Sequence, residues 1–298
     1  MSRIRDERGQ AIVLTVVFLA TLMGMAALVL DVGHWYRSQR DLQAVADSAA
    51  LAGAQALPSD TGLAGVLAAQ YSASNGGPAP QVTFSSTNLP NDTITVQVHR
   101  TEPGFFSKIF SIDSATIGSK ATARTGTIGS AQYAAPFGID KRQPELQCLP
   151  DPCTNPTSLD LQKVGPGAFR LLNIDSSYGG TGTQILGDWV LHGYDGLMDV
   201  DQWYYSDSGS KFNSTNVDDA LSIRLGDELL FPVYDKVKAQ GSGFQYHVIG
   251  WAGFVVTGFD GNGNSGHIQG HFTSFLAQGL QGISSNPSFG TYNVQLVD

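Results

Sequence analysis

Two histidines near the C-terminus have a spacing that suits metal binding. His267 and His271 lie four residues apart, which brings two imidazoles to one face of a helix or a strand. The glycines and phenylalanines around them favour a strand, and no third ligand accompanies them, so we expect a strand face rather than a metal site. Just before them, Asp260, Asn262 and Asn264 imitate the start of a calcium loop. Its sixth position is Ser265 instead of glycine and its twelfth is His271 instead of glutamate, so a hairpin turn is the expected structure.

Acidic residues offer two further candidates for chemistry. Asp199 and Asp201, with Asp195 nearby, have the residue type of the carboxylate pair of glycoside hydrolases, but exposed loop acids explain them equally well. Residues 175–177 resemble the start of a metal-dependent adhesion motif, whose second serine position holds Gly179. The sequence has neither a nucleophile elbow nor a phosphate-binding glycine loop. We therefore expect a protein that is not an enzyme and that needs neither cofactor nor metal.

The two cysteines of the chain lie close together in the sequence CLPDPC. In an oxidising compartment Cys148 and Cys153 are expected to form a disulfide that closes this small loop and contributes about 2 kcal/mol. A metal site would need a second pair of ligands at suitable spacing, and none is visible.

The element that positions everything else is the run Ala11–Leu30, which contains no charged residue. At ~1.5 Å per residue it is roughly 30 Å long, the thickness of the hydrocarbon core of a bilayer. A buried helix of a soluble protein would carry a polar stripe, and a cleaved signal sequence would have a shorter apolar region. Trp35 and Tyr36 suit the membrane interface, and Arg3, Arg5 and Arg8 before the run place the N-terminus inside. The sequence predicts one transmembrane helix, with residues 31–298 outside the cytoplasm.

Composition supports a large exterior part that is rich in strands. The chain has 298 residues, of which 35 are glycine and 13 proline, and only 14% are charged. Residues 1–130 contain nine basic and nine acidic side chains, whereas residues 131–298 contain eight basic and seventeen acidic ones, so the net charge of −9 lies in the second half. Such a surface repels phosphate backbones, and we expect no binding to nucleic acid.

Helical periodicity continues beyond the apolar run, so one helix from Gln10 to Leu57 is expected, ending before Pro58. Small residues on its outer half permit close packing against another helix or a sheet. This packing is within the chain, between copies of it, or both, and the sequence favours neither. The residues expected on this face are Leu42, Val45, Ala49, Ala52, Gly53 and Ala56.

A second helix is expected over residues 61–75, followed by strands over residues 81–86, 93–99 and 115–125 and by a short amphipathic helix over residues 103–110. Composition changes from Gly126, which suggests a boundary or a connection between strands. Beyond it we expect a short helix over residues 217–225 and a β-rich domain, as a sandwich, with strands over residues 168–172, 188–192, 202–205, 228–234, 246–258 and 266–276. The expected fold is α+β. Its parts are a leader (1–10), a transmembrane helix (11–30), a pilin-like helix-plus-antiparallel-sheet unit (31–130) and a β-rich exterior domain (131–298).

The N-terminal region resembles the TadG-like N-terminal module of the Flp pilus-assembly (Tad) family. The resemblance covers about residues 8–57. It rests on Arg8–Ala11, on Asp31, Gly33 and Tyr36 at the membrane exit, and on the run Leu42–Ala54. It implies a bacterial protein, anchored by one helix in the inner membrane, with other pilus-assembly proteins as partners. Processed pilins carry a glutamate five residues after the glycine at which they are cut, and here that position after Gly9 is Leu14. We therefore expect an uncleaved leader, and an intact mass showing a chain that begins at Gln10 would contradict this.

Two functions follow from these observations. The first is a structural or assembly component of a tight-adherence pilus or a related secretion machine, in contact with membrane lipid, with other pilus-assembly proteins and, if the small-residue face packs between copies, with itself. The alternative is a membrane-tethered extracytoplasmic binding module or hydrolase.

Overall fold

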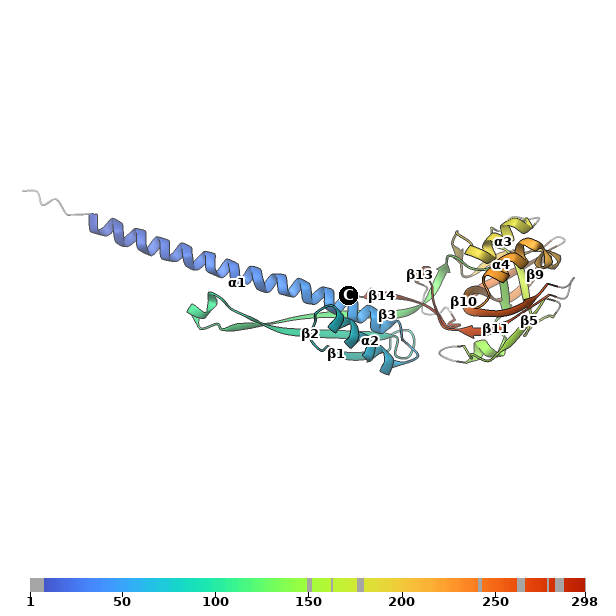
Figure 1. Ribbon diagram of the computed structural model, residues 1–298, viewed down its shortest axis with the longest axis horizontal. Coiled ribbons are helices and arrows are strands. Elements are labelled where there is room, and N and C mark those ends of the chain that lie inside the picture. The colour runs from blue at the N-terminus through green and yellow to red at the C-terminus, as the bar shows by residue number, and fades with distance from the viewer. Residues whose placement is uncertain are drawn as a thin grey trace, which may run out of the picture.

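The computed structural model of the protein describes residues 8–148, 152–161, 163–175, 180–240, 243–261, 266–277, 279–281 and 287–297. Figure 1 shows an elongated molecule, in which a long helix extends from one end and a strand-rich unit forms the other. Between them lies a sheet that runs alongside the second half of the helix. The architecture is α+β, as the sequence predicts, with a long apolar helix followed by β-rich structure.

Helix α1 (Arg8–Ala54) is continuous over 47 residues, or about 70 Å. It is long and apolar enough to cross a membrane, and its most apolar segment is not buried inside the protein. The helix ends at Ala54, three residues before the predicted end, because the chain tightens there into turns with i−3 hydrogen bonds and the Thr125 hydroxyl donates to the Ala54 carbonyl at 2.6 Å.

Helix α2 (Thr61–Ser74) packs beside the end of α1. Its N-cap residue is Asp60, whose side chain accepts a hydrogen bond from the Leu63 N–H at 2.8 Å. Alanines of α2, among them Ala64 and Ala68, are fully buried against α1 and the sheet. Small side chains on both helices permit this close approach.

The first sheet is built on a long hairpin. Strand β2 (Thr93–Pro103) pairs antiparallel with β3 (Ser114–Ala131) along its whole length, and β1 (Gln81–Ser85) pairs with the other edge of β2. Only Ser107–Phe110 at the hairpin tip is helical, as the 3₁₀ turn η1, in place of the predicted helix over residues 103–110. Strand β3 passes through Gly126 without a break, so the change of composition there marks no interruption of the strand.

The last strand of the chain returns to this first sheet. Strand β14 (Thr291–Val297) pairs antiparallel with residues 122–127 of β3, although it follows the strand-rich unit in sequence. Figure 1 shows β14 running back from the strand-rich unit to the C-terminus beside α1. Three short strands complete the sheet: β7 (Met198–Asp199) and β13 (Gly279–Gln281) pair with β3, and β12 (Phe275–Leu276) pairs with β14.

The second sheet closes on itself instead of forming the expected sandwich. Its hydrogen-bonded order is β5-β11-β10-β8-β6-β4-β9, and β9 also pairs with β10, so that five of the strands form a ring. Closure removes two free edges from the sheet. The strands are β4 (Phe137–Asp140), β5 (Thr157–Asp160), β6 (Phe169–Asn173), β8 (Gln202–Ser206), β9 (Glu228–Gln240), β10 (Gly243–Asp260) and β11 (His267–Thr273).

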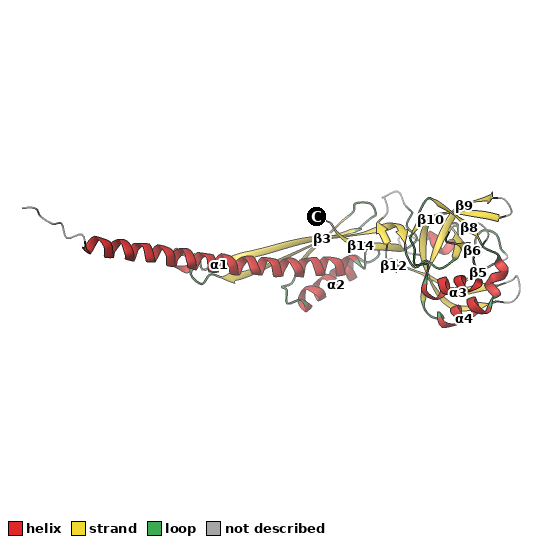
Figure 2. Ribbon diagram, turned by 90° about the horizontal axis from the view of Figure 1, so that it is seen from above, coloured by secondary structure: helices red, strands yellow, loops and turns green. Residues whose placement is uncertain are grey.

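Helices α3 (Thr183–His192) and α4 (Thr215–Ile223) lie together on one side of this barrel, as both views show (Figures 1 and 2). Two further 3₁₀ turns are η2 (Pro144–Gln147) and η3 (Gly209–Asn213). The strand predicted over residues 188–192 is wrong, because this segment is the last part of α3. The buried side chains of α3, Leu186, Trp189 and Val190, follow helical spacing, and Gly193 with φ 79° ends the helix.

Candidate functional sites

The first candidate site lies where α1 leaves its apolar segment and meets the tip of the β2–β3 hairpin. The Asp31 carboxylate accepts hydrogen bonds from the backbone N–H groups of Phe105 at 3.1 Å, Phe106 at 2.9 Å and Ser107 at 2.6 Å. Asp31 is fully buried, and these three donors compensate a charge that would otherwise be buried without a partner. The contact joins segments more than 70 residues apart in sequence and fixes the tip to the helix.

A second set of contacts lies one helical turn further along α1. Glu102 accepts hydrogen bonds from Ser38 at 2.7 Å and from His34 at 3.3 Å, and together these bonds hold the pKa of the Glu102 carboxyl below its usual range. The Trp35 indole N–H donates to the Pro103 carbonyl at 3.3 Å. The partners on β2 lie at the end of that strand, so these contacts hold the hairpin just after the apolar run of α1. We call the contacting residues, Asp31, His34, Trp35 and Ser38 of α1 with residues 102–107 of the hairpin, the clasp.

The structure places most of the small-residue face of α1 in a hydrophobic core within the chain. Leu42 and Ala49 are fully buried, and Val45 and Ala52 nearly so. Leu42, Val45 and Ala49 pack with apolar side chains of α2, β2 and β3, and the half-buried Ala56 packs at the margin of the same core. A Cβ at Gly53 would lie 2.5 Å from Ile94 Cδ1, so that glycine permits the close approach. The buried residues of this face therefore pack within the chain.

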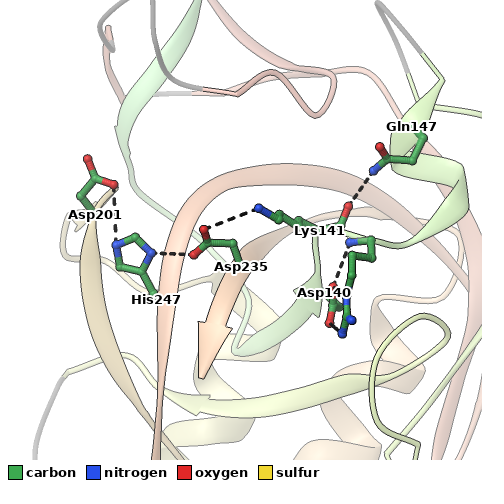
Figure 3. Close-up of polar contacts among 7 residues, drawn as sticks. Asp140, Lys141, Gln147, Asp201, Asp235 and His247 are labelled. Carbon is green, nitrogen blue, oxygen red and sulfur yellow. Dashed lines mark hydrogen bonds and ion pairs between the residues drawn. The ribbon is translucent and has the colours of Figure 1, made fainter. Parts of the chain in front are cut away.

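The second candidate site is a group of charged side chains on the barrel, shown in Figure 3. His247 on β10 is hydrogen-bonded through Nδ1 to Asp235 of β9 at 2.6 Å, and its Nε2 lies 3.7 Å from Asp201. Lys141 approaches the other oxygen of Asp235 at 3.6 Å. The indole of Trp203 lies beside the imidazole, with ring centroids 5.0 Å apart. Pairing of β9 and β8 with β10 brings the histidine, the two aspartates and the indole together, and pairing of β4 with β9 adds the lysine.

The electrostatics of this second site are those of a stabilising network. Burial alone would raise the pKa of Asp235, but the hydrogen bond from His247 and the nearby Lys141 hold that pKa below its usual range. In the same way, Arg142 overcomes the effect of burial and lowers the pKa of Asp140. Nucleophilic catalysis needs a hydroxyl or thiol beside the second ring nitrogen of the histidine. Here Nε2 faces the carboxylate of Asp201, which is largely exposed.

The remaining candidates from the sequence fall into three groups. His267 and His271 lie half-buried on β11, and no group of three or more His, Cys, Asp or Glu side chains within the described residues is arranged to hold a metal ion. Asp195 and Asp199 are exposed, and Cys148 is joined to Cys153 with a Cα–Cα distance of 5.4 Å. The calcium-like loop at 262–265 and the end of the adhesion-like motif at 176–179 lie outside the described residues.

With this geometry established, the chain was compared with known proteins. Residues 9–56 match the family model described as putative Flp pilus-assembly TadE/G-like. The match confirms the Tad resemblance over α1 and the turn that follows it. Comparison with curated proteins and with solved structures gives no match. The Tad segment is therefore the helix that carries both the apolar run and the clasp residues Asp31, His34 and Ser38.

Reasoning from sequence singled out Asp31 of the first site and Asp201 of the second, and missed the residues that they contact. Asp31 was among the residues that carry the Tad resemblance, but its partners at 105–107 could not be known without the path of the hairpin. The pairing of His247 with Asp235 was not anticipated. The available signal was a histidine in the predicted strand 246–258 and an aspartate one residue beyond the end of the predicted strand 228–234, and only the register of β9 against β10 brings them into contact.

Proposed function

We propose that this protein is a membrane-anchored structural or assembly component of a Flp-type pilus or a related secretion machine. The apolar part of α1 spans the inner membrane of a bacterium, the N-terminus lies in the cytoplasm, and the sheet and barrel lie outside. This role requires no catalytic activity. The Tad match over residues 9–56 supports the biological setting, and the exposed apolar segment supports the anchor.

The observation that carries the proposal is the continuity of α1. A single helix without a break begins in the apolar run and ends in the buried core of the first sheet. The clasp adds a second attachment between helix and sheet near residue 31. The chain enters the barrel from β3, returns to β3 at β7 and again at β14, so the barrel is connected to this sheet at several points of the sequence. A load on the barrel would therefore pass through the sheet to the anchor.

The partners we propose are other pilus-assembly proteins, which contact exposed surfaces of the sheet and the barrel. Exposed apolar side chains suitable for such contacts include Val66 of α2 and Ile223 of α4. A photo-activated crosslinker placed at either position in the native membrane is expected to capture components of the assembly machine. The same crosslinker at Leu221, which is fully buried on α4, is the matched control.

Genetic complementation gives the decisive test. Deleting the gene is expected to abolish surface pili, and the wild-type chain is expected to restore them. A His247→Gln chain should restore them as well, because the proposed role uses no catalysis. Normal pili after deletion, together with no captured machine component from the exposed positions, would contradict the proposal.

A tethered binding module remains the alternative because of one feature of the barrel. An open groove of about 540 Å³, lined by Arg170, Asp207, Ser208 and neighbouring residues, has the polar character of a site for a hydrophilic ligand. A glycan-binding screen of the full chain tests this alternative. Saturable binding that is lost in an Arg170→Gln variant would favour it.

A further inference from the structure

The tip of the β2–β3 hairpin carries a cluster of exposed apolar side chains. Phe105 is 60% exposed, Ile109 80%, Phe106 42% and Ile112 46%. Single exposed apolar residues are ordinary on protein surfaces, but four large ones within eight residues form a patch that marks an interaction site. Lys108 lies among them and is also exposed. We call residues 105–112 the apolar tip.

The contacts between the hairpin and α1 show where this tip lies. Going from the sheet towards the tip, the Lys120 carbonyl accepts from Gln43, and Ser119 donates to the Gln39 carbonyl. The partner on α1 thus moves towards the N-terminus as the hairpin proceeds.

The same direction continues through the clasp. Glu102 contacts Ser38 and His34, and residues 105–107 contact Asp31. Residues 108–112 close the hairpin after this last contact. Asp31 is the first residue after the uncharged run 11–30, so the tip is held at the end of the span and not near the barrel. Figures 1 and 2 agree, since the hairpin runs beside α1 towards its N-terminal half in both views.

We propose that the apolar tip inserts into the interface of the extracytoplasmic leaflet of the membrane that α1 crosses. This inference rests on the membrane anchor of the proposed function and adds a second contact with lipid. Three hydrogen bonds to the buried Asp31 hold the tip at one height on α1, so whenever the apolar run lies in the hydrocarbon, the tip lies at the headgroup level. Phenylalanine and isoleucine side chains gain free energy there by leaving water.

Other residues around the tip fit the same environment. The Lys108 ammonium can reach lipid phosphate while its aliphatic stem stays among the apolar side chains. Trp35 and Tyr36 lie on α1 close to the clasp, and aromatic residues of this kind gather at membrane interfaces. Two contacts with the membrane, the span and the tip, would fix the tilt and the rotation of α1. The exterior sheet and barrel would then project from the membrane in one direction.

Fluorescence from single labelled cysteines in the full-length protein tests this inference. The Cys148–Cys153 disulfide is left oxidised, and an environment-sensitive NBD dye is attached to Ile109→Cys. The protein is reconstituted, with no other protein present, in vesicles of phosphatidylethanolamine and phosphatidylglycerol. We expect an emission shift to shorter wavelength and a several-fold loss of intensity when lipids carry a nitroxide near the headgroup.

Two matched positions make the result interpretable. Val17→Cys, 58% exposed in the apolar run, should be quenched by nitroxides deep in the bilayer, and Phe244→Cys, 53% exposed on the barrel, should be quenched by none. If the Val17 label is in lipid while the Ile109 label behaves like the Phe244 label, the tip inference is wrong and the anchor stands. If the Val17 label is in water, the anchor and the tip both fail. A shift at Ile109 that appears only at high protein density would identify a second copy as the occupant and overturn the lipid assignment.

Discussion

Replacement of Gly53 by alanine tests the packing that joins α1 to α2 and the first sheet. The new Cβ would lie 2.5 Å from Ile94 Cδ1, 2.9 Å from the Ala64 carbonyl oxygen and 3.3 Å from the Ala68 Cβ. The side chain of Ile94 can turn away, but the Ala64 oxygen belongs to the backbone of α2, so that helix must shift. Overpacking of this kind costs about 1–3 kcal/mol. The better helix propensity of alanine offsets roughly 0.5–1 kcal/mol of that cost. We expect a net destabilisation of about 1–2 kcal/mol.

The assay is hydrogen exchange of the full-length protein in nanodiscs, read from peptides of α2 and β2. A loss of one to two kcal/mol corresponds to exchange about 5–30 times faster where the amides exchange through opening of this core. Gly33→Ala is the matched control, because it makes the same change in the same helix where no atom lies within 4 Å of the added Cβ. It should leave exchange unchanged or slow it. Equal exchange in the two variants would refute the tight α1–α2 contact and with it the rigid connection between anchor and sheet.

Three further predictions concern a buried aspartate of the first sheet, the charged network on the barrel and the disulfide. Asp92 is fully buried and accepts backbone hydrogen bonds at 2.6–2.9 Å from residues 87–89, and these lower its pKa although burial opposes them. The stability that the Asp92 carboxylate contributes should therefore be complete above its unfolded pKa of about 3.9 and be lost as pH falls through its folded pKa. Asp92→Asn should lower the free energy of unfolding by about 1–3 kcal/mol at neutral pH. A plot of that free energy against pH should also fall less steeply on its acid side than it does for the wild type. Asp235→Asn should lower the free energy of unfolding of the barrel by about 1–3 kcal/mol, because His247 loses its charged partner. Urea unfolding followed by tryptophan fluorescence measures this free energy, and an unchanged midpoint would argue against the network. Serine at both Cys148 and Cys153 should cost about 2 kcal/mol in the same assay, and a loss far above this would mean that the loop has a larger role in the fold.

Local patterns predicted the helices near the N-terminus well. The apolar run and the alanine-rich continuation appear as one helix, and α2 lies within one residue of the predicted range 61–75. The pairs of strands around residues 81–99 and after residue 114 were also expected, although β2 and β3 extend further than their alternation indicated. Long periodic segments are predictable because their side chains repeat the same environment many times.

Short segments in the second half were harder to assign. The stretch 188–192 was expected to be a strand, because five residues do not distinguish the two periodicities, whereas the full range of α3 shows helical spacing. The calcium-like and catalytic interpretations of the acidic residues rested on residue type alone, and the calcium-like loop at 262–265 lies outside the described residues. The partly buried network around Asp235 was not found because its members come from segments far apart in the sequence.

The sequence by itself determined that the chain has an apolar helix able to cross a membrane, an α+β fold and a Tad-type N-terminal segment. Each of these depends on patterns within contiguous residues. Only the tertiary structure decided that β14 returns to the first sheet, that the barrel closes through β9 and β10, and that Asp31 holds the hairpin tip. These features depend on which segments pair across long separations, and one strand can satisfy its hydrogen bonds on many partners. The partners that form are those that leave the buried polar groups hydrogen-bonded. This requirement can be met only in the folded chain, where the polar groups are buried.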